Sequence, residues 1–231
     1  PVPGTFIRHI DESSTSLQSL LTSEALFGRT VTGSSWIERD QEVTDIYDVM
    51  YSPDGDLYTK NDSFILYSQN NGETFTVINW PSETFPPYDG TNLYILGDDV
   101  LFINDFLGYC YYSINNGQSW QLGGQLFLSI ETVARMVDDF IYLADPSSIG
   151  AGIIARINVS TGQLEIIDIL RLAIPYDPIY CQIIEDGTVY MLGIDPSGPQ
   201  SENHLLQYKF GQEVESLGPY PNPTDAWSFF A

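Results

Sequence analysis

Two pairs of adjacent carboxylates are the first candidates for catalytic residues in this chain. Asp98-Asp99 and Asp138-Asp139 each place two acids side by side, and two carboxyl groups about 5–9 Å apart can hydrolyse a glycosidic bond. Both pairs lie at equivalent places between two strand-like runs, whereas a single active site would occur only once. We therefore interpret them as solvated turns and assign no catalytic residue.

Other reactive side chains are few. The chain has two histidines, His9 and His204, and two cysteines, Cys110 and Cys181. Neither histidine has neighbours at metal-ligand spacing, and the glycine-rich and serine-centred motifs of nucleotide binding and hydrolysis do not occur. We predict no metal site and no cofactor. The cysteines could form a disulfide between neighbouring repeats or stay two buried thiols, and the sequence leaves both readings open.

The charge of the chain excludes some classes of partner. Its 231 residues include 8 Lys+Arg and 31 Asp+Glu, which gives a net charge of −23. A nucleic-acid or anionic membrane surface needs clustered basic residues, and eight scattered ones cannot form a patch. No apolar run approaches the roughly 18 residues of a membrane span. We expect no nucleic-acid partner, no membrane span and an acidic surface suited to an extracellular or saline solution.

Aromatic side chains are the best candidates for a binding face. They make up 13% of the chain, and most of them should fill a core. Some fall in proline-rich segments that we expect to be loops, where binding faces usually occur. Such residues could contact a glycan or a protein partner. The candidates are Trp80, Phe85, Tyr88 and Tyr176.

An internal repeat defines the elements that position these residues. Ser68–Phe75 reads S-Q-N-N-G-E-T-F, and Ser113–Trp120 reads S-I-N-N-G-Q-S-W 45 residues later. Turn glycines continue the period at Gly33, Gly72, Gly117, Gly162 and Gly211. Acidic turns recur in phase at Ser52–Gly55, Gly97–Asp99, Val137–Asp139 and Glu185–Gly187. Each period therefore reads strand, acidic turn, strand, longer loop, strand, glycine turn, strand.

Four short antiparallel strands in about 45 residues are typical of a β-propeller blade. We expect an all-β chain that forms a β-propeller of about five four-stranded blades. A solenoid would need shorter repeats, and a β-sandwich would lack the internal period. The segment Leu17–Phe27 could also form a short amphipathic helix, but the register of the repeat favours strands.

The two octapeptides resemble the Asp-box, or BNR repeat, whose pattern is S-x-D-x-G-x-x-W. The matching residues are Ser68, Asn70, Gly72, Phe75, Ser113, Asn115, Gly117 and Trp120. Asn replaces the namesake acid in both copies, and its side-chain oxygen can accept the same backbone N–H bonds. The resemblance implies a structural turn between the third and fourth strands of a blade, with the closing aromatic packed between sheets.

This resemblance does not define a function, because the family includes sialidases, xyloglucan-active glycosidases, sortilin-type receptors and photosystem assembly factors. A sialidase would carry an arginine cluster and a Phe-Arg-Ile-Pro signature, of which Phe6-Ile7-Arg8 is a faint echo. Xyloglucan-active relatives are generally longer, with two propellers. We predict an exported, non-catalytic binding or scaffold module for a protein or glycan, within a larger cell-surface protein or assembly. The alternatives are a glycoside hydrolase or lyase with paired carboxylates and, more weakly, a fragment of a sortilin-like propeller.

The end of the chain has a separate composition. We assign residues 1–217 to the propeller and residues 218–231 to a proline-rich exit, or to a closing strand at Ala226–Phe230. The segment Leu217–Pro223, L-G-P-Y-P-N-P, resembles the junction at which secreted Bacteroidota proteins pass into a C-terminal type IX sorting domain. That resemblance implies export, with residues 218–231 as the start of such a domain.

Overall fold

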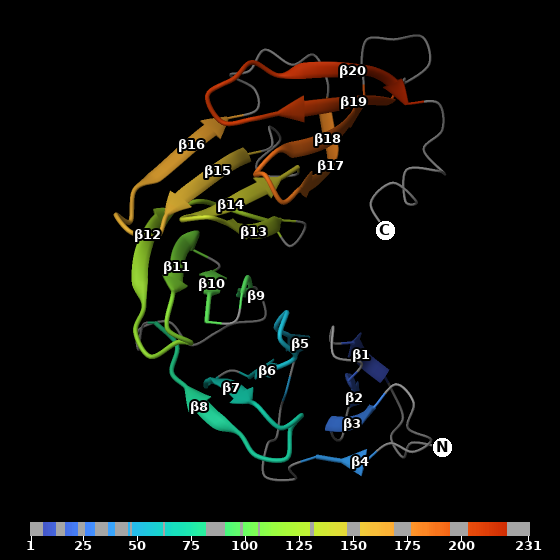
Figure 1. Cartoon of the computed structure of the whole chain (residues 1–231), viewed down its shortest axis with the longest axis vertical. Coiled ribbons are helices and arrows are strands. Elements are labelled where there is room, and N and C mark those ends of the chain that lie inside the picture. The colour runs from blue at the N-terminus through green and yellow to red at the C-terminus, as the bar shows by residue number, and fades with distance from the viewer. Residues whose placement is uncertain are drawn as a thin grey trace. The chain divides into compact units, whose positions relative to one another are not determined.

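The computed structural model contains five four-stranded antiparallel sheets (Figure 1). It describes residues 7–12, 17–22, 26–30, 37–39, 46, 48–61, 63–81, 91–97, 99–105, 107–129, 132–146, 153–168, 177–194 and 203–220. No residue in these ranges is helical. Nor do these ranges contain a helix of the length and apolarity that a membrane span requires. The expected all-β class is confirmed.

Every sheet is built from four strands that are consecutive in the chain. The first contains β1 (Ile7–Glu12), β2 (Leu17–Thr22), β3 (Leu26–Thr30) and β4 (Ile37–Glu38). The second contains β5 (Asp48–Tyr51), β6 (Leu57–Lys60), β7 (Ile65–Ser68) and β8 (Thr76–Ile78). The third contains β9 (Asn92–Ile95), β10 (Leu101–Asn104), β11 (Tyr109–Ser113) and β12 (Gln121–Gln125). The fourth contains β13 (Val133–Val137), β14 (Phe140–Asp145), β15 (Ile153–Asn158) and β16 (Leu164–Asp168). The fifth contains β17 (Asp177–Ile183), β18 (Val189–Ile194), β19 (Asn203–Tyr208) and β20 (Glu215–Tyr220).

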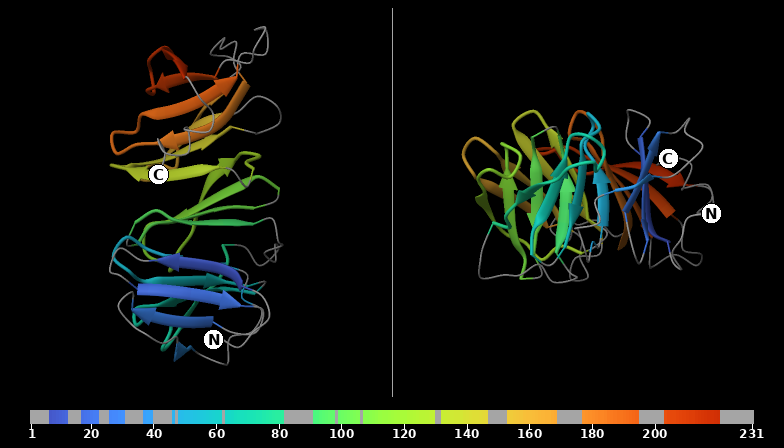
Figure 2. Two further views of the ribbon diagram at one scale, coloured as in Figure 1. Left: turned by 90° about the vertical axis from the view of Figure 1, so that its right-hand side faces the viewer. Right: turned by 90° about the horizontal axis from the view of Figure 1, so that it is seen from below.

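Neighbouring strands in a sheet run antiparallel, and Figure 2 shows these twisted sheets from two further directions. The meander gives each sheet two different ends. We call the end with the first-to-second and third-to-fourth hairpins the turn end. The other end, with the second-to-third connection and the link to the next sheet, is the loop end.

The turn residues lie where the repeat predicts them. Gly72, Gly117, Gly162 and Gly211 have φ values of 80°, 73°, 71° and 81°, a region that glycine enters at little cost. Gly33 lies outside the described residues. The four acidic turns separate the first and second strands of the second to fifth sheets. The segment Leu17–Phe27 forms β2 and the start of β3, so its interpretation as strands is confirmed.

The chain divides into two compact units. Unit 1 comprises residues 1–106 and 111–121, and unit 2 comprises residues 107–110 and 122–231. In unit 1 a buried cluster joins the second and third sheets through Tyr58, Ile65, Ile78, Leu93, Leu101 and Ile103. A smaller cluster consists of Leu26, Ile46, Val49 and Leu57. Full burial of an aliphatic side chain contributes roughly 1.5–3 kcal/mol to stability.

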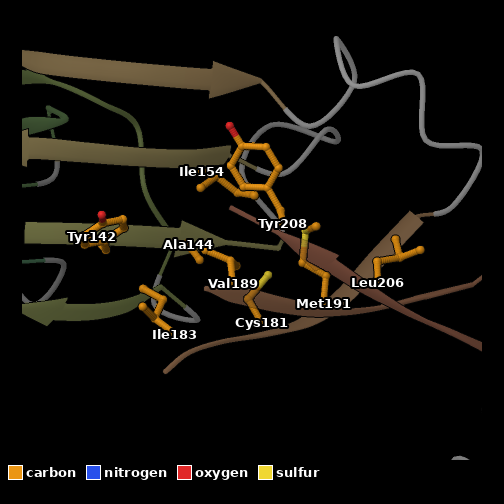
Figure 3. Close-up of a cluster of buried hydrophobic side chains, with 9 residues drawn as sticks. All are labelled: Tyr142, Ala144, Ile154, Cys181, Ile183, Val189, Met191, Leu206 and Tyr208. Carbon is orange, nitrogen blue, oxygen red and sulfur yellow. The ribbon is translucent and has the colours of Figure 1, made fainter. Parts of the chain in front are cut away.

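In unit 2 the fourth and fifth sheets share one buried cluster (Figure 3). Its members are Tyr142, Ala144, Ile154, Cys181, Ile183, Val189, Met191, Leu206 and Tyr208. Cys110 and Cys181 are both buried and form no disulfide, which decides between the two readings that the sequence left open. Burial, together with nearby Asp145, raises the pKa of the Cys181 thiol, so this group stays protonated and unreactive at neutral pH.

The end of the chain is described only in part. Strand β20 runs from Glu215 to Tyr220 and therefore includes the boundary predicted between residues 217 and 218. Residues 221–231 lie outside the described residues, and with them most of the proline-rich segment and the whole of Ala226–Phe230. The assignment of these residues stays a prediction.

Candidate functional site

The first octapeptide forms a closed hydrogen-bonded turn between β7 and β8. The Ser68 hydroxyl donates to Asn70 Oδ1 at 2.9 Å and accepts the Gly72 N–H at 2.8 Å. The Thr74 N–H donates to Asn70 Oδ1 at 2.9 Å, and Asn70 Nδ2 donates to Thr74 Oγ1 at 3.0 Å. Asn70 therefore both accepts and donates, whereas an ionised Asp at this place could only accept.

The second octapeptide repeats this turn between β11 and β12. Ser113 Oγ donates to Asn115 Oδ1 at 2.9 Å and accepts the Gly117 N–H at 2.8 Å. Ser119 N–H donates to Asn115 Oδ1 at 2.9 Å, and Asn115 Nδ2 donates to Ser119 Oγ at 2.8 Å. Because two separate segments adopt the same geometry, the local sequence determines the turn.

The aromatic residues that close the octapeptides contact preceding sheets of unit 1. Phe75 packs against the cluster that contains Leu26 and Val49. Trp120 packs against the cluster between the second and third sheets, and its indole N–H donates to the Asn79 carbonyl at 3.0 Å. The closing aromatic of each copy thus packs against a cluster that includes residues of the preceding sheet.

Four residues at the turn ends of the second and third sheets form what we call the tyrosine network: Asp56, Tyr58, Tyr67 and Asn116. The buried Tyr58 hydroxyl donates to Asn116 Oδ1 at 2.9 Å. The Tyr67 hydroxyl donates to the Asp56 carboxylate, and the Asn116 side chain lies near this hydroxyl and acts to lower its pKa. The Tyr58 and Tyr67 ring centroids are 5.0 Å apart.

Both phenols of the tyrosine network are held in the protonated form. Burial is the largest cause of the raised pKa of Tyr58, and Tyr67 and the carboxylates of Asp56, Asp54 and Asp99 add to it. Burial and the hydrogen bond to Asp56 raise the pKa of Tyr67 to about 12. At neutral pH the two hydroxyls are therefore donors and not bases. Sequence reasoning missed this network, because Tyr58 and Asn116 are 58 residues apart.

Basic side chains are engaged within the protein wherever the structure describes them. In unit 2 the Arg156 guanidinium lies 4.6 Å from the Phe140 ring centre and 4.4 Å from that of Phe210, and it pairs with Glu165 at 2.7 Å. The other pairs are Arg39–Glu73 at 3.4 Å, Arg135–Glu185 at 3.8 Å, Lys209–Asp186 at 2.9 Å and Lys60 Nζ to the Thr91 carbonyl at 2.7 Å. Each of these five basic side chains thus has a partner within the chain, and the side chains of Arg8, Arg29 and Arg171 lie outside the described part.

The adjacent carboxylates lie on hairpin turns. Asp99, Asp138 and Asp139 are exposed, and Asp98 lies outside the described residues. Two of these turns use backbone carbonyls to hold the neighbouring hairpin: Asn116 N–H donates to the Asp99 carbonyl, and Val159 N–H to that of Asp139, each at 2.9 Å. The described residues contain no group of three or more His, Cys, Asp and Glu that could hold a metal ion.

The predicted binding-face aromatics are described in one case only. Trp80 is partly buried and packs against the cluster of the second and third sheets, so core packing uses much of its surface. Phe85, Tyr88 and Tyr176 lie outside the described residues. Phe127 was missed, although it follows β12 closely as Trp80 follows β8, and it is 51% exposed. The same signal, an aromatic residue in a link between sheets, would have identified it.

The segment that presents Phe127, residues 126–129, is fixed at both ends within unit 2. At one end Leu126 N–H donates to the Gly108 carbonyl at 2.6 Å. A Cβ at Gly108 would lie 2.8 Å from the Leu126 carbonyl oxygen, so this close approach requires glycine. At the other end the fully buried Asp145 carboxylate accepts the Ser129 N–H, and the Ser129 hydroxyl at 2.9 Å. An exposed aromatic ring is thus held on an ordered loop-end segment.

The search against known proteins finds similarity in structure and none in sequence. No family model and no curated protein matches the chain. A complex of the fission yeast SREBP–SCAP binding domains matches with a TM-score of 0.62 and 13% identity, over 96% of this chain and 64% of that one. YCF48 from Cyanidioschyzon merolae matches with a TM-score of 0.57 and 11% identity, over 94% and 72%. The GH74 xyloglucanase from Xanthomonas campestris matches with a TM-score of 0.55 and 14% identity, over 95% and 38%.

Structural similarity at such low identities shows the fold alone and leaves the ligand open. The chain spans less than two thirds of the fission yeast and xyloglucanase chains. The matching structures are β-propellers, and a WD40 domain is among them. The described sheets and these similarities together show that the chain has the β-propeller fold.

Proposed function

We propose that this chain is an exported, non-catalytic β-propeller that binds a protein or glycan partner through the loop ends of its sheets. The observation that carries the proposal is Phe127, a 51% exposed aromatic side chain on the ordered segment 126–129. Exposed aromatic residues on a preorganised segment are typical binding anchors, since little conformational freedom is lost on association.

The use of the polar groups supports a binding role over a hydrolytic one. At the turn ends the octapeptide side chains and the tyrosine network satisfy one another. Asp138 and Asp139 are exposed on one hairpin turn, whereas hydrolysis by paired carboxylates needs two carboxyl groups facing an enclosed sugar. The fission yeast match is itself a complex of two binding domains, so that propeller holds a protein partner.

Export and the finer family assignment belong to the same proposal. We assign the chain to the Asp-box type because both octapeptides follow its pattern and share one turn geometry. The net charge of −23 suits an extracellular setting. The segment Leu217–Pro223 would mark the junction to a type IX sorting domain in a larger cell-surface protein or assembly.

Site-specific photo-crosslinking in the source organism tests the binding face. A photoreactive phenylalanine derivative is placed at residue 127, and the matched control carries it at residue 122, where Leu122 is 56% exposed on the outer strand β12. The proposal predicts one dominant crosslinked partner from residue 127 and none from residue 122. Equal crosslinking at both residues, or none at either, would contradict it.

A hydrolysis assay tests the non-catalytic half of the proposal. The purified chain is incubated with xyloglucan, sialosides and a panel of other glycans, and the release of reducing ends is measured. The matched variants are Asp138→Asn with Asp139→Asn, and Asp99→Asn. We expect no release by any of these proteins. Release by the wild type that a carboxylate variant abolishes would replace the binding module with a glycosidase.

A further inference from the structure

Each octapeptide contains an Asn-Gly bond whose side-chain amide is held by tyrosine. Asn71-Gly72 and Asn116-Gly117 have left-handed asparagines, with φ of 54° and 53°. Asn-Gly bonds are the most prone to deamidation in flexible chains, because glycine leaves its own backbone nitrogen unhindered. That nitrogen attacks the preceding Asn side chain, so the hydrogen bonds of the amide determine how readily the reaction occurs.

The two amides are held by different parts of unit 1. Tyr51, which donates to Asn71 Oδ1 at 2.7 Å, lies on β5 of the same sheet as Asn71. Asn116 follows β11, and its amide oxygen accepts the Tyr58 hydroxyl from β6, with Tyr67 on β7 nearby; both tyrosines belong to the preceding sheet. The hydrogen bond on the Asn116 side chain therefore exists only while the second and third sheets are in contact.

The nucleophile of the reaction is restrained as well. The Gly117 N–H donates to Ser113 Oγ at 2.8 Å, and a Cβ at this glycine would lie 2.2 Å from Ile78 Cγ2 on the preceding sheet. The backbone at residue 117 is thus pressed against β8, and rotation toward the Asn116 side chain needs these contacts to open.

We propose that Asn116 is a conditional deamidation site, protected by Tyr58 and Tyr67 and exposed to reaction when the second and third sheets separate. In the reaction the Gly117 nitrogen loses its proton and forms a bond to Asn116 Cγ. The bond from Cγ to Nδ2 breaks, and ammonia leaves. Water then opens the cyclic imide at either carbonyl and leaves aspartate or isoaspartate at position 116.

The product would favour the separated state. A carboxylate at position 116 lies in the field of Asp54, Asp56 and Asp99, the acids that already act on Tyr58, and like charges at close range repel. Isoaspartate lengthens the backbone inside the turn and displaces the Gly117 N–H from Ser113. Molecules whose second and third sheets had separated would therefore carry aspartate or isoaspartate at position 116 permanently.

Peptide mapping by mass spectrometry tests the proposal, with Asn71 as an internal standard. Wild type, Tyr58→Phe and the matched control Tyr51→Phe are incubated at mildly alkaline pH, and the mass increase from exchange of amide for hydroxyl is followed at both asparagines. We expect Tyr58→Phe to accelerate reaction at Asn116, on the order of tenfold for a lost buried hydrogen bond, and to leave Asn71 unchanged. Tyr51→Phe should accelerate the reaction at Asn71 and leave Asn116 unchanged.

Two results would overturn this inference. One is an unchanged rate at Asn116 in Tyr58→Phe, which would show that the tyrosine does not protect the amide. The other is an equal increase in the deamidation rate at both asparagines in each variant, which would show that general unfolding, and not a local restraint, controls the reaction.

Discussion

Two contacts between neighbouring sheets differ in the side chains that form them at the turn ends, and we call each contact a joint. In unit 1 the second and third sheets meet through the tyrosine network, where the buried Tyr58 donates its hydroxyl to the partly buried Asn116 amide. In unit 2 the fourth and fifth sheets meet through Arg156, whose guanidinium lies between the rings of Phe140 and Phe210. The repeat thus determines strands and turns, while each joint has its own contacts.

This difference predicts different responses to mutation. A buried hydroxyl-amide joint depends on every partner, because one lost group leaves the other unsatisfied. A cation between two rings tolerates change better, since the rings keep their contact with the apolar stem of the side chain. The predictions below test this contrast.

The largest effect is expected from filling the space at a turn glycine in the polar joint. In Gly117→Ala the new methyl would clash with Ile78, and the positive φ of 73° adds backbone strain. We expect a loss of about 2–5 kcal/mol in the free energy of unfolding, measured by urea titration. The matched control is Gly211→Ala, with φ of 81° and no neighbour within 4 Å of the new atom. It should cost about 1–2 kcal/mol. Equal losses in the two variants would show that the clash with Ile78 does not add to the backbone strain.

The next largest effect is expected in Tyr58→Phe. The substitution removes one hydroxyl, keeps the ring in the core and leaves Asn116 Oδ1 without its donor. We expect a loss of about 1–3 kcal/mol in the free energy of unfolding. A change below the error of the titration would mean that water replaces the lost donor of Asn116. The Tyr58 hydroxyl would then not stabilise the contact between the two sheets.

A smaller effect is expected in Arg156→Met, which keeps the stem and removes the cation. The loss should be about 0.5–2 kcal/mol, the range of a cation–π contact. The control Arg135→Met removes a more exposed guanidinium that is 3.8 Å from Glu185, and it should cost about 0–1 kcal/mol. If Arg156→Met cost more than Tyr58→Phe, the contrast between the joints would be reversed.

A further effect is confined to alkaline pH. The pKa of Tyr67 is about 12 in the folded chain and about 10 in an unfolded one. The unfolded chain therefore loses this proton first, so the contribution to stability is complete below about pH 10 and is lost between pH 10 and 12. Tyr67→Phe should make the thermal midpoint fall less steeply over this interval. A slope identical to that of the wild type would contradict the role of Tyr67.

The fold could be predicted from the sequence because its signals are local. Gly72 and Gly117 need a positive φ, and each octapeptide forms its hydrogen bonds within itself. The turns and the 45-residue period can therefore be recognised in the amino-acid sequence. The acidic turns separate strands for the same reason. The strands and turns that these local patterns predicted therefore agree with the structure.

Contacts between sheets could not be predicted in this way. Tyr58 and Asn116 are 58 residues apart, and nothing near either residue indicates its partner. Arg156 appears in the sequence as an isolated cation, although two distant rings enclose it. Phe127 follows a strand as Trp80 does, but no proline marks its segment as a loop. Exposure of a side chain depends on how the segment is fixed, here by Gly108 and Asp145.

The most direct test of the binding role is the affinity of the partner that crosslinks to residue 127. Its dissociation constant is measured by calorimetry for the wild type, for Phe127→Ala and for the control Leu122→Ala, which also removes an exposed apolar side chain. The account predicts at least about tenfold weaker binding for Phe127→Ala and a change within about twofold for Leu122→Ala. Equal affinities for all three proteins would contradict a binding face at this loop end.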